Sequence, residues 1–420
     1  MSEIIQPTSA SEVAAAMRRA SDARQSLVIR GAGTKSDWGR PGGRVDAILD
    51  MGRMNRILMH EHGDMTATIE AGATLRNVNH ALSAHRQTLP LDPPFADRAT
   101  IGGLLATNDS GPLRHRYGTP RDLVIGIQLA TTDGVLAKAG GVVVKNVAGY
   151  DLSKLVTGSF GSLAAIVSAT FKLAPLPAAS KTMQVVVHDA AALGQIVRTM
   201  MSSQLEPVAF EVSTQRSTQN PQNAQNNPGS ASSAGSALYV VIRFASLPAV
   251  VDAQIAQATE AVKAFATSIE VIDGDAERAL WDEHATQLWD APGAIVRASW
   301  LPANIADGLT ELAHLKTCAT SLSGRATPAR LKSCATSVIG RAAIGAGLIR
   351  IDGDTASQAR VIEQLRVSTL FGNIVIVRGS DELKSIVDVW GSHGDRQPLF
   401  DALKHAFDPN GVLNAGRGPL

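Results

Sequence analysis

The sequence has few cysteines, no excess of either charge and no long apolar run. Cys318 and Cys334 are the only cysteines in 420 residues. Two are too few for a four-cysteine iron–sulfur site or a disulfide framework within the chain. The 39 basic and 38 acidic side chains nearly cancel, which argues against nucleic acid or an anionic membrane surface as the partner. No apolar run approaches the roughly 18 to 20 residues that cross a bilayer.

Targeting and metal-binding patterns are missing as well. The N-terminus, Met-Ser-Glu-Ile-Ile-Gln-Pro, lacks the basic start and apolar stretch of a secretory signal, so we expect a cytoplasmic, soluble protein. The ten histidines show no His-x-x-x-His spacing. The nearest cluster, His60-Glu61-His62 beside Gly63, is typical of a solvated polar loop, and we predict no metal site.

Glycine-rich loops, in contrast, occur twice in the first part of the chain. The first, Arg30 to Ser36, follows the apolar run Leu27-Val28-Ile29, and the second, Thr100 to Gly103, follows a proline-rich turn. Glycine lets main-chain N–H groups approach an anionic ligand closely, and hydroxyl side chains add donors. Two such loops from one domain are suited to hold the diphosphate of a dinucleotide.

The first loop differs from the two common phosphate-binding motifs. A Rossmann fingerprint needs Gly-x-Gly-x-x-Gly opening directly into a helix, whereas Ser36 occupies the third glycine position and the segment Asp37 to Gly43 that follows cannot start a helix. The Gly-Lys-Ser/Thr phosphate loop is also absent. On its own, therefore, the first loop is also compatible with a tight surface turn.

Two prolines, in Pro175-Leu176-Pro177, mark the best domain boundary. Before it, the pattern predicts helices near 8–20, 74–84 and from 101, with a hairpin over 123–131 and 134–139. Beyond it, strands at 182–188, 207–213, 238–244, 269–273, 294–300, 342–351 and 373–378 alternate with helices at 190–203, 248–266, 302–316 and 355–367. This order predicts an α+β domain, an antiparallel sheet covered on one face by helices.

Two segments interrupt the second domain. Residues 214–236 carry almost no apolar side chain and are predicted to be a disordered insertion, because they cannot offset the entropy of ordering. Leu315 to Arg325 nearly repeats as Leu331 to Arg341. Two copies cannot build a solenoid, so a local tandem duplication over 315–341 explains the repeat better.

Taken together, the motifs resemble the FAD-binding domain of the vanillyl-alcohol oxidase superfamily. The resemblance rests on both glycine-rich loops and on Asn108-Asp109-Ser110-Gly111, Arg116-Tyr117-Gly118, Asp133-Gly134, Thr157 to Ile166 and the C-terminal Phe407 to Arg417, all in the family's order. It implies an α+β fold: a two-subdomain PCMH-type FAD-binding domain (1–177), an α+β cap or substrate domain (178–395) and a C-terminal tail (396–420) that returns to the FAD domain.

Within the superfamily the chain is most similar to the FAD-binding (E) subunits of glycolate oxidase. The segments Lys145 to Leu155 and Asp388 to Gly391 carry this likeness. It implies a complex with a larger D-type flavoprotein that oxidises glycolate to glyoxylate and an F-type iron–sulfur subunit that passes electrons to membrane quinone. This chain would then be peripheral at the inner face of the membrane only through those partners.

The resemblance also implies a set of residues that hold FAD non-covalently. These are Arg30, Gly31, Ala32, Gly33, Thr34, Lys35, Ser36, Pro93, Pro94, Thr100, Ile101, Gly102, Gly103, Asn108, Ser110, Gly111, Tyr117, Gly118, Asp122, Gly158, Gly161, Ser162 and Ile166. Some relatives attach flavin through a histidine of the first loop, where this chain offers Lys35. Phe160 replaces an acidic residue of many relatives and Ala164 a glycine, so flavin contacts there are predicted to be looser.

Substrate residues are harder to assign. Removing a hydride from a 2-hydroxy acid needs a base near the hydroxyl and a cation for the carboxylate. The carboxylate candidates are Arg297, Arg350 and Arg378 at predicted strand ends, with Tyr150 as a residue that faces the flavin; ordinary strand-end or turn roles explain each of them equally well. The histidine pair and carboxylate of many relatives are missing, since the histidines of the predicted second domain, at 188, 284, 314 and 393, are dispersed. No catalytic base is assigned.

Three functions fit these patterns. The first is an FAD-binding subunit of a glycolate dehydrogenase complex. The second is a stand-alone FAD-dependent dehydrogenase for a small 2-hydroxy acid such as D-lactate. The third is a non-catalytic structural subunit of the same complex that keeps the fold but binds no flavin, which Phe160 and Ala164 favour.

Overall fold

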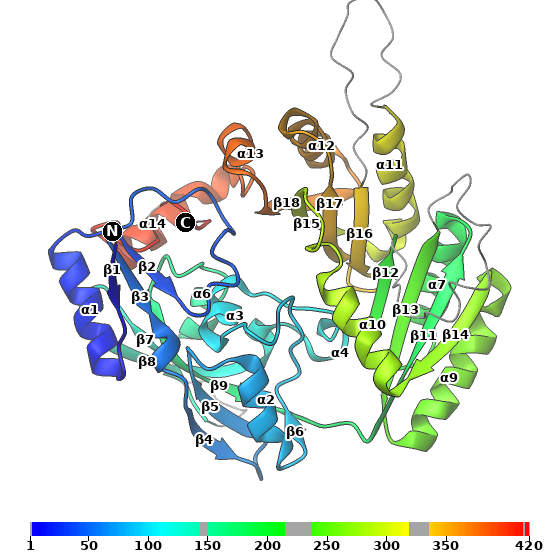
Figure 1. Ribbon diagram of the computed structural model, residues 1–420, viewed down its shortest axis with the longest axis horizontal. Helices are drawn as coiled ribbons and strands as arrows, with labels where there is room; N and C mark the ends of the chain where they lie inside the picture. The colour runs from blue at the N-terminus through cyan, green and yellow to red at the C-terminus, as the bar shows by residue number, and fades with distance from the viewer. Residues whose placement is uncertain (1, 143–149, 215–236, 319–335, 415, 420) are drawn as a thin grey trace, which may run out of the picture. The chain divides into compact units, whose positions relative to one another are not determined.

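The computed structural model describes residues 2–142, 150–214, 237–318, 336–414 and 416–419 (Figure 1). The chain divides into two compact units: the first unit comprises Met1–Leu176 and Ser392–Leu420, and the second unit Pro177–Gly391. Three predictions lie wholly or mostly outside the described residues. The first is the similarity of Lys145 to Leu155 to the E subunits, of which residues 145–149 are not described. The second is the insertion after Thr214. The third is the duplicated segment, whose residues 319–335, with Cys334, are not described.

A small parallel sheet begins the first unit. Its strands β1 (Glu3–Ile5), β3 (Ala47–Asp50) and β2 (Leu27–Arg30) lie in the order β1-β3-β2. Helix α1 (Ala10–Asp22) buries its apolar side in the core of this unit, and the Ser9 hydroxyl caps it by accepting the Glu12 N–H at 3.3 Å. Because β2 leads straight into the first glycine-rich loop, the sheet fixes where that loop starts.

A five-stranded antiparallel sheet forms the rest of the framework. Its order is β4 (Ile57–Glu61), β5 (Thr66–Glu70), β9 (Ala165–Lys172), β7 (Val124–Ala130) and β8 (Leu136–Gly140). The predicted hairpin is confirmed as β7 and β8. Around the sheet lie α2 (Leu75–Ser83), α3 (Ile101–Thr107), α4 (Arg114–Tyr117), α5 (Pro120–Leu123), α6 (Leu152–Val156) and the short pair β6 (Gln87–Thr88) with β10 (Ala174–Pro175).

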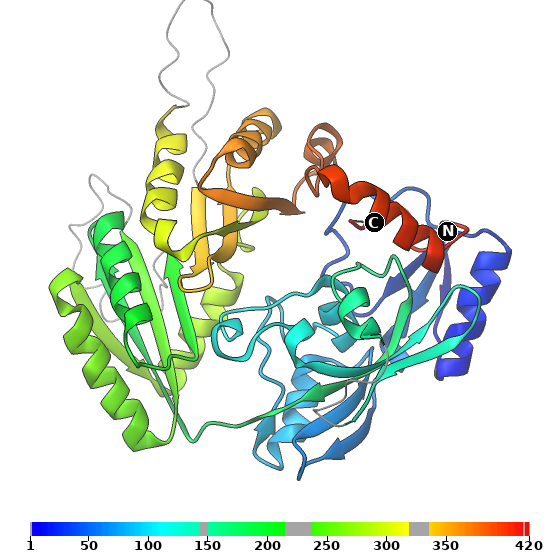
Figure 2. The same ribbon diagram turned by 180° about the vertical axis from the view of Figure 1, so that it is seen from behind.

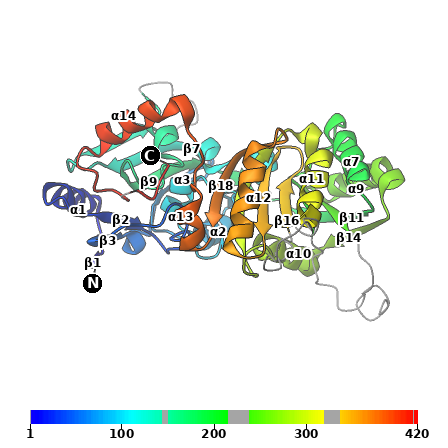
Figure 3. The same cartoon turned by 90° about the horizontal axis from the view of Figure 1, so that it is seen from above.

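The C-terminal tail belongs to the first unit. Helix α14 (Gln397–Phe407), drawn in red in Figure 3, follows the start of this tail at Ser392. Thr132, just after β7, donates its hydroxyl to the Phe407 carbonyl at 2.9 Å. The last residues of the sequence therefore contact elements formed from its first 170 residues.

The second unit is built on one eight-stranded sheet in which all neighbouring strands are antiparallel. Its order is β14 (Ser268–Asp273), β11 (Ala179–Val187), β13 (Leu238–Ser246), β12 (Ala209–Ser213), β16 (Thr336–Arg341), β17 (Ala346–Ile351), β15 (Ala294–Trp300) and β18 (Phe371–Arg378). This confirms the predicted α+β class with an antiparallel sheet. The predicted single strand at 342–351 is wrong: β16 ends at Arg341 and a tight turn with Gly345 at φ +70° precedes β17.

Helices cover both faces of this sheet. On one face α7 (Ala190–Ser202), α9 (Pro248–Val262), α11 (Ile305–Cys318) and α12 (Thr355–Val367) enclose an apolar core (Figure 2). On the other face lies α10 (Gly274–Thr286), where Trp281 donates its indole N–H to the Thr182 hydroxyl at 2.9 Å. Thr182 alternates with the core residue Met183 along β11, so it points to the opposite face. The prediction of helices on one face only is therefore wrong.

Another helix of the second unit, α13 (Asp381–Ile386), follows β18. Ser380 caps it by accepting the Leu383 N–H at 3.1 Å. None of the helices in the described ranges combines the length and apolarity needed to cross a membrane.

Candidate functional site

The first loop is shaped by short local contacts. After β2, Gly33 adopts φ +74°, and the N–H groups of Ser36 and Trp38 donate to the carbonyls of Gly33 and Lys35, each at 3.1 Å. The Lys35 ammonium lies 3.3 Å from Asp109 Oδ2, and both side chains are more than nine-tenths buried. The loop is thereby tied to the segment that follows the second loop.

The second loop is held by main-chain pairing with residues 71–75. Leu75 N–H donates to Ala99, Ile101 N–H to Ala73, and Gly102 N–H to Ala71, at 2.8 to 3.0 Å. A Cβ on Gly102 would lie 2.8 Å from the Ala71 Cβ, so this position requires glycine for close packing. Thr100 is the N-cap of α3, so Ile101, Gly102 and Gly103 form the first turn of that helix.

The two loops touch each other at Gly31. A Cβ added to Gly31 would lie 2.1 Å from the Thr100 hydroxyl oxygen, far inside van der Waals contact. Only glycine allows this approach. The structure thus brings together two loops that are seventy residues apart in the sequence.

Two adjacent cavities open between these loops. The first has a volume of about 640 Å³, including its part open to solvent, and is lined by Val28, Ile29, Arg30, Gly31, Ala32, Gly33, Thr34, Lys35, Ser36, Trp38, Thr100, Gly103, Ala106, Thr107, Phe160, Asn414 and Arg417. The second has a volume of about 430 Å³, again including its part open to solvent, and is lined by Ile29, Gly31, Met51, Ala71, Thr100, Gly102, Gly103, Ala106, Phe160, Gly161, Ala164 and Ile166. Their shared wall makes them one elongated site with a cationic end and an apolar end.

The predicted cofactor residues fall into two groups. All seven residues of the first loop, with Thr100, Gly102, Gly103, Gly161 and Ile166, line these cavities. The others do not line them: Pro93, Pro94, Ile101, Asn108, Ser110, Gly111, Tyr117, Gly118, Asp122, Gly158 and Ser162. Several of that second group shape the loops instead; Gly158, for example, donates its N–H to Leu105 at 2.9 Å. Their direct contact with FAD stays a prediction.

Sequence reasoning missed several wall residues. Met51, Ala71 and Ala106 carry no chemistry that a motif could reveal. Asn414 and Arg417 lie in a segment that the resemblance already included, but nothing in the sequence indicated that their side chains reach the first loop. Phe160, noted only as a substitution, has φ +57° and lines both cavities.

Asp122 shapes the turn after α4. Burial raises the pKa of its carboxyl, but the Thr119 N–H and hydroxyl, at 2.8 and 2.7 Å, and the charges of Arg114 and Arg121 lower it further, so that the net pKa lies below its ordinary value. A lowered folded-state pKa gives stability that is present above the ordinary pKa and is lost as pH falls through the folded-state pKa.

We therefore expect Asp122→Asn to reduce acid sensitivity. The melting temperature of the wild type should fall more steeply than that of the variant below about pH 4, where unfolded carboxyls protonate. Thermal melts across pH 3 to 7 measure this. Parallel curves for the two proteins would contradict it.

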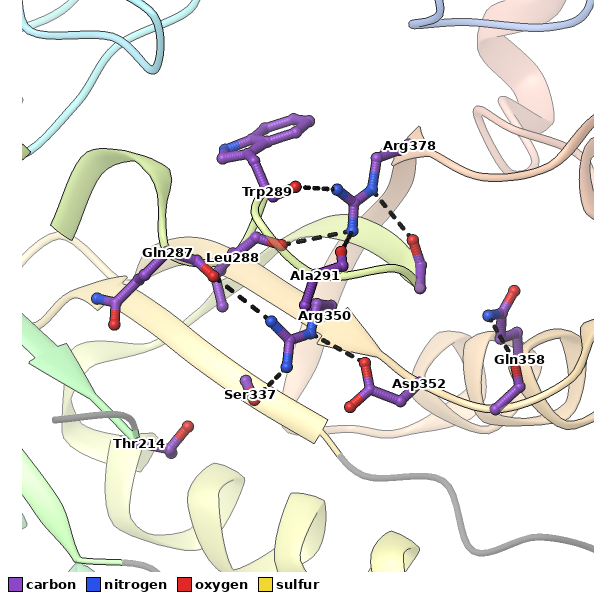
Figure 4. Close-up of polar contacts among 12 residues, drawn as sticks. Thr214, Gln287, Leu288, Trp289, Ala291, Ser337, Arg350, Asp352, Gln358 and Arg378 are labelled. Atoms are coloured by element: carbon purple, nitrogen blue, oxygen red, sulfur yellow. Dashed lines mark hydrogen bonds and ion pairs between the residues drawn. The ribbon is translucent and has the colours of Figure 1, made fainter. Parts of the chain in front are cut away.

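Three of the four predicted substrate residues lie on neighbouring strands of the second unit. The register of β15, β17 and β18 places Arg297, Arg350 and Arg378 on the face opposite the apolar core. Arg350 donates to Asp352 at 2.9 Å, to the Gln287 carbonyl at 3.4 Å and to Ser337 at 3.5 Å (Figure 4). The fourth, Tyr150, is 91% exposed just before α6. Their contact with substrate stays a prediction.

Arg378 has a structural role in the second unit. Its guanidinium donates to the carbonyls of Leu288, Trp289, Ala291 and Gly293 at 2.6 to 3.4 Å (Figure 4). The planar fork of arginine suits such multiple bonds. One side chain thus holds the loop between α10 and β15.

We expect Arg378→Gln to destabilise the second unit by about 2 kcal/mol, because four partly buried carbonyls lose their donor. Chemical denaturation of the purified variant measures this. Unchanged stability together with a raised KM for a 2-hydroxy acid would favour the carboxylate-binding role instead.

The histidines of the second unit do not converge. His188 pairs with Asp189 at 3.2 Å, and the buried His284 contacts Glu211 at 3.3 Å. Within the described ranges, no three side chains of His, Cys, Asp or Glu are arranged to hold a metal ion.

Two family models match the chain. One, described as an FAD binding domain, covers residues 1–140, and the other, described as the C-terminal domain of FAD linked oxidases, covers residues 176–365. The first includes both loops of the site, and the second includes most of the eight-stranded sheet.

Curated relatives are similar at modest identity. Glycolate oxidase subunit GlcD of Bacillus subtilis is 31% identical over 50% of this chain and 44% of its own length, and subunit GlcE of Escherichia coli is 34% identical over 43% and 51%. D-2-hydroxyglutarate dehydrogenase of Xanthomonas citri is 30% identical over 70% and 60%. The chain thus spans about half the length of these relatives.

Solved structures share the fold. The 4-ethylphenol oxidase of Gulosibacter chungangensis matches with a TM-score of 0.72 at 15% identity, over 99% of this chain and 88% of that one. Alkyldihydroxyacetonephosphate synthase matches at 0.70 and 17%, over 98% and 76%. These likenesses confirm the predicted fold class.

The cofactor is FAD, and the site fits it. Both loops line one cavity, cationic side chains lie at the same end, and apolar residues line the other end. One buried acceptor in the wall, Asn414 Oδ1, has no hydrogen-bond partner among the described residues. Such an acceptor is expected where a ligand supplies the donor.

Proposed function

We propose that the chain is an FAD-dependent oxidoreductase of the FAD-linked oxidase type and the FAD-binding subunit of a complex that oxidises glycolate to glyoxylate. The observation that carries this proposal is the shared chemistry of its relatives. Their names specify glycolate oxidase subunits, D-lactate dehydrogenases and D-2-hydroxyglutarate dehydrogenases. All four name 2-hydroxy acids as the substrate class.

The reaction removes a hydride from the carbon that bears the hydroxyl and a proton from the hydroxyl oxygen, leaving a 2-oxo acid. FAD, when bound, takes up the two electrons. The residues of the first unit hold the cofactor: the first loop offers main-chain donors, and Thr100 and Gly103 form the opposite wall.

Two observations favour a subunit that works with partners. Two of the relatives are themselves named as subunits. In addition, Arg350 and Arg378 already donate to side chains and carbonyls of their own unit. We propose that a D-type flavoprotein provides the acid–base residues and that an F-type iron–sulfur subunit carries electrons to quinone, with the assembly at the inner face of the membrane.

A stand-alone 2-hydroxy acid dehydrogenase is the second candidate. The D-2-hydroxyglutarate dehydrogenase match favours it, because it extends over 70% of this chain and so beyond the FAD domain. In that case the isolated chain would reduce its own flavin with D-lactate or a related acid.

Reconstitution with and without this chain tests the proposal. The D-type and F-type partners are expressed together, and glycolate-dependent reduction of a quinone analogue is measured. We expect activity only when this chain is added. Full activity without it would contradict the subunit role, and a chain that restores activity only with its FAD loops intact would exclude a purely structural subunit.

A further inference from the structure

The end of the chain is paired with the strand that starts the first loop. Leu27 N–H donates to Val412 at 2.8 Å, Asn414 N–H donates to Leu27 at 3.0 Å, and Leu27 forms a parallel bridge with Leu413. Residues 412–414 thus extend the β1-β3-β2 sheet at its β2 edge. This places the tail directly beside the diphosphate loop.

A buried carboxylate fixes this arrangement. Asp408, 2% exposed, accepts the N–H groups of Val412 and Leu413 at 3.0 and 2.8 Å. The Lys404 ammonium donates to Asp408 at 2.6 Å and also to the carbonyls of Ser162 and Leu413. The tail is therefore an anchored structure whose position is well determined by charge-assisted bonds.

Asn414 turns its side chain into the wall of the first cavity. Its Nδ2 donates to the Phe160 carbonyl, which can only accept, so the amide orientation follows from the partner. Its Oδ1 is then directed away from that bond. This oxygen is the buried acceptor already described without a partner in the described chain.

Arg417 contributes a cation to the same cavity. The Arg40 N–H donates to its carbonyl at 3.1 Å, and its guanidinium lies 3.4 Å from the Trp38 carbonyl. Burial lowers the pKa of the guanidinium and the negative charge of Asp37 only partly opposes this. A nearby anion would therefore stabilise the charged form.

We propose that Arg417 is a counter-ion of the FAD diphosphate, so that the last residues of the chain complete the cofactor site. The guanidinium shares its cavity with all seven residues of the first loop, whose main chain is suited to phosphate. Main-chain dipoles by themselves compensate only part of the negative charge of a diphosphate. An arginine can compensate more of it, because its guanidinium pairs with phosphate through two N–H groups.

Binding of ADP and FAD to the flavin-free protein tests this assignment. ADP carries the diphosphate without the flavin ring, so it isolates the charge contact. By calorimetry, Arg417→Gln should weaken both ligands by at least about tenfold, equivalent to about 1.4 kcal/mol. Arg417→Lys should recover part of the loss. Arg44→Gln is the matched control, since Arg44 is 90% exposed and pairs with Asp46 outside the cavity.

The salt dependence of ADP affinity distinguishes a direct charge contact from a purely structural role of Arg417. The ADP affinity of the wild type should fall more steeply with ionic strength than that of Arg417→Gln. Wild-type ADP affinity in Arg417→Gln, equal salt slopes, or no recovery with lysine would each overturn the proposal. The assignment rests on FAD alone, so a chain that binds ADP as expected but takes no part in glycolate oxidation would leave it standing.

Discussion

Gly31→Ala is expected to abolish retention of FAD. The added methyl would lie 2.1 Å from the Thr100 hydroxyl oxygen and 3.0 Å from its Cβ. Both atoms belong to a loop that is paired on its other side with residues 71–75, so the loop cannot retreat without breaking those bonds. The cavities between the loops should therefore change shape, and FAD affinity should fall by at least about a hundredfold, or about 2.7 kcal/mol.

Gly43→Ala is the matched control, because a Cβ there meets nothing within 4 Å. It should retain FAD as the wild type does. Thr100→Gly in the Gly31→Ala background removes the clashing side chain and should recover part of the affinity. Normal FAD content in Gly31→Ala would show that the cofactor does not depend on the contact of the two loops.

In Glu277→Ala, the second unit is expected to unfold at a much lower denaturant concentration than in the wild type. Glu277 Oε1 accepts the hydroxyls of Ser180 and Thr182, each at 2.7 Å, and lies 3.2 Å from the Arg243 guanidinium. Its side chain is 4% exposed. Removal of one partner from such a buried network leaves the other charge uncompensated, and we expect a loss of about 3 kcal/mol.

Asp275→Ala on the same helix controls for the loss of a carboxylate. Asp275 pairs with Arg278 at the surface, where it is 92% exposed, so its removal should change stability by less than about 1 kcal/mol. Denaturant unfolding of both variants measures the difference. Equal stabilities would mean that α10 is not held to the sheet by Glu277.

The sequence was sufficient to predict the two glycine-rich loops as part of the site but not to predict all residues that line the cavity. A glycine-rich turn after a strand has a local signature, so Arg30 to Ser36 and Thr100 to Gly103 could be identified as one site. Arg417 could not, because its position depends on pairing between Leu413 and Leu27, which are almost the full chain length apart. Contacts of this kind are set by the sheet, and no local pattern encodes them.

The second unit shows the same limit. Alternating apolar residues predicted most strands of its sheet, including β13 and β15, since the period of two is local. Helix α10 was missed, because it faces the sheet with Glu277 and Trp281 and has little apolar periodicity. The polar residues Glu277 and Trp281 of this helix are accounted for by their contacts with Thr182 and Arg243, which lie on the distant strands β11 and β13.

The visible spectrum of this chain, purified alone and then mixed anaerobically with glycolate, tests the central claim most directly. The account predicts one FAD per chain, a flavin band that glycolate alone leaves oxidised, and bleaching once the D-type flavoprotein is added. Bleaching by glycolate without a partner would show a self-sufficient dehydrogenase. A colourless protein that takes up no added FAD would contradict the account.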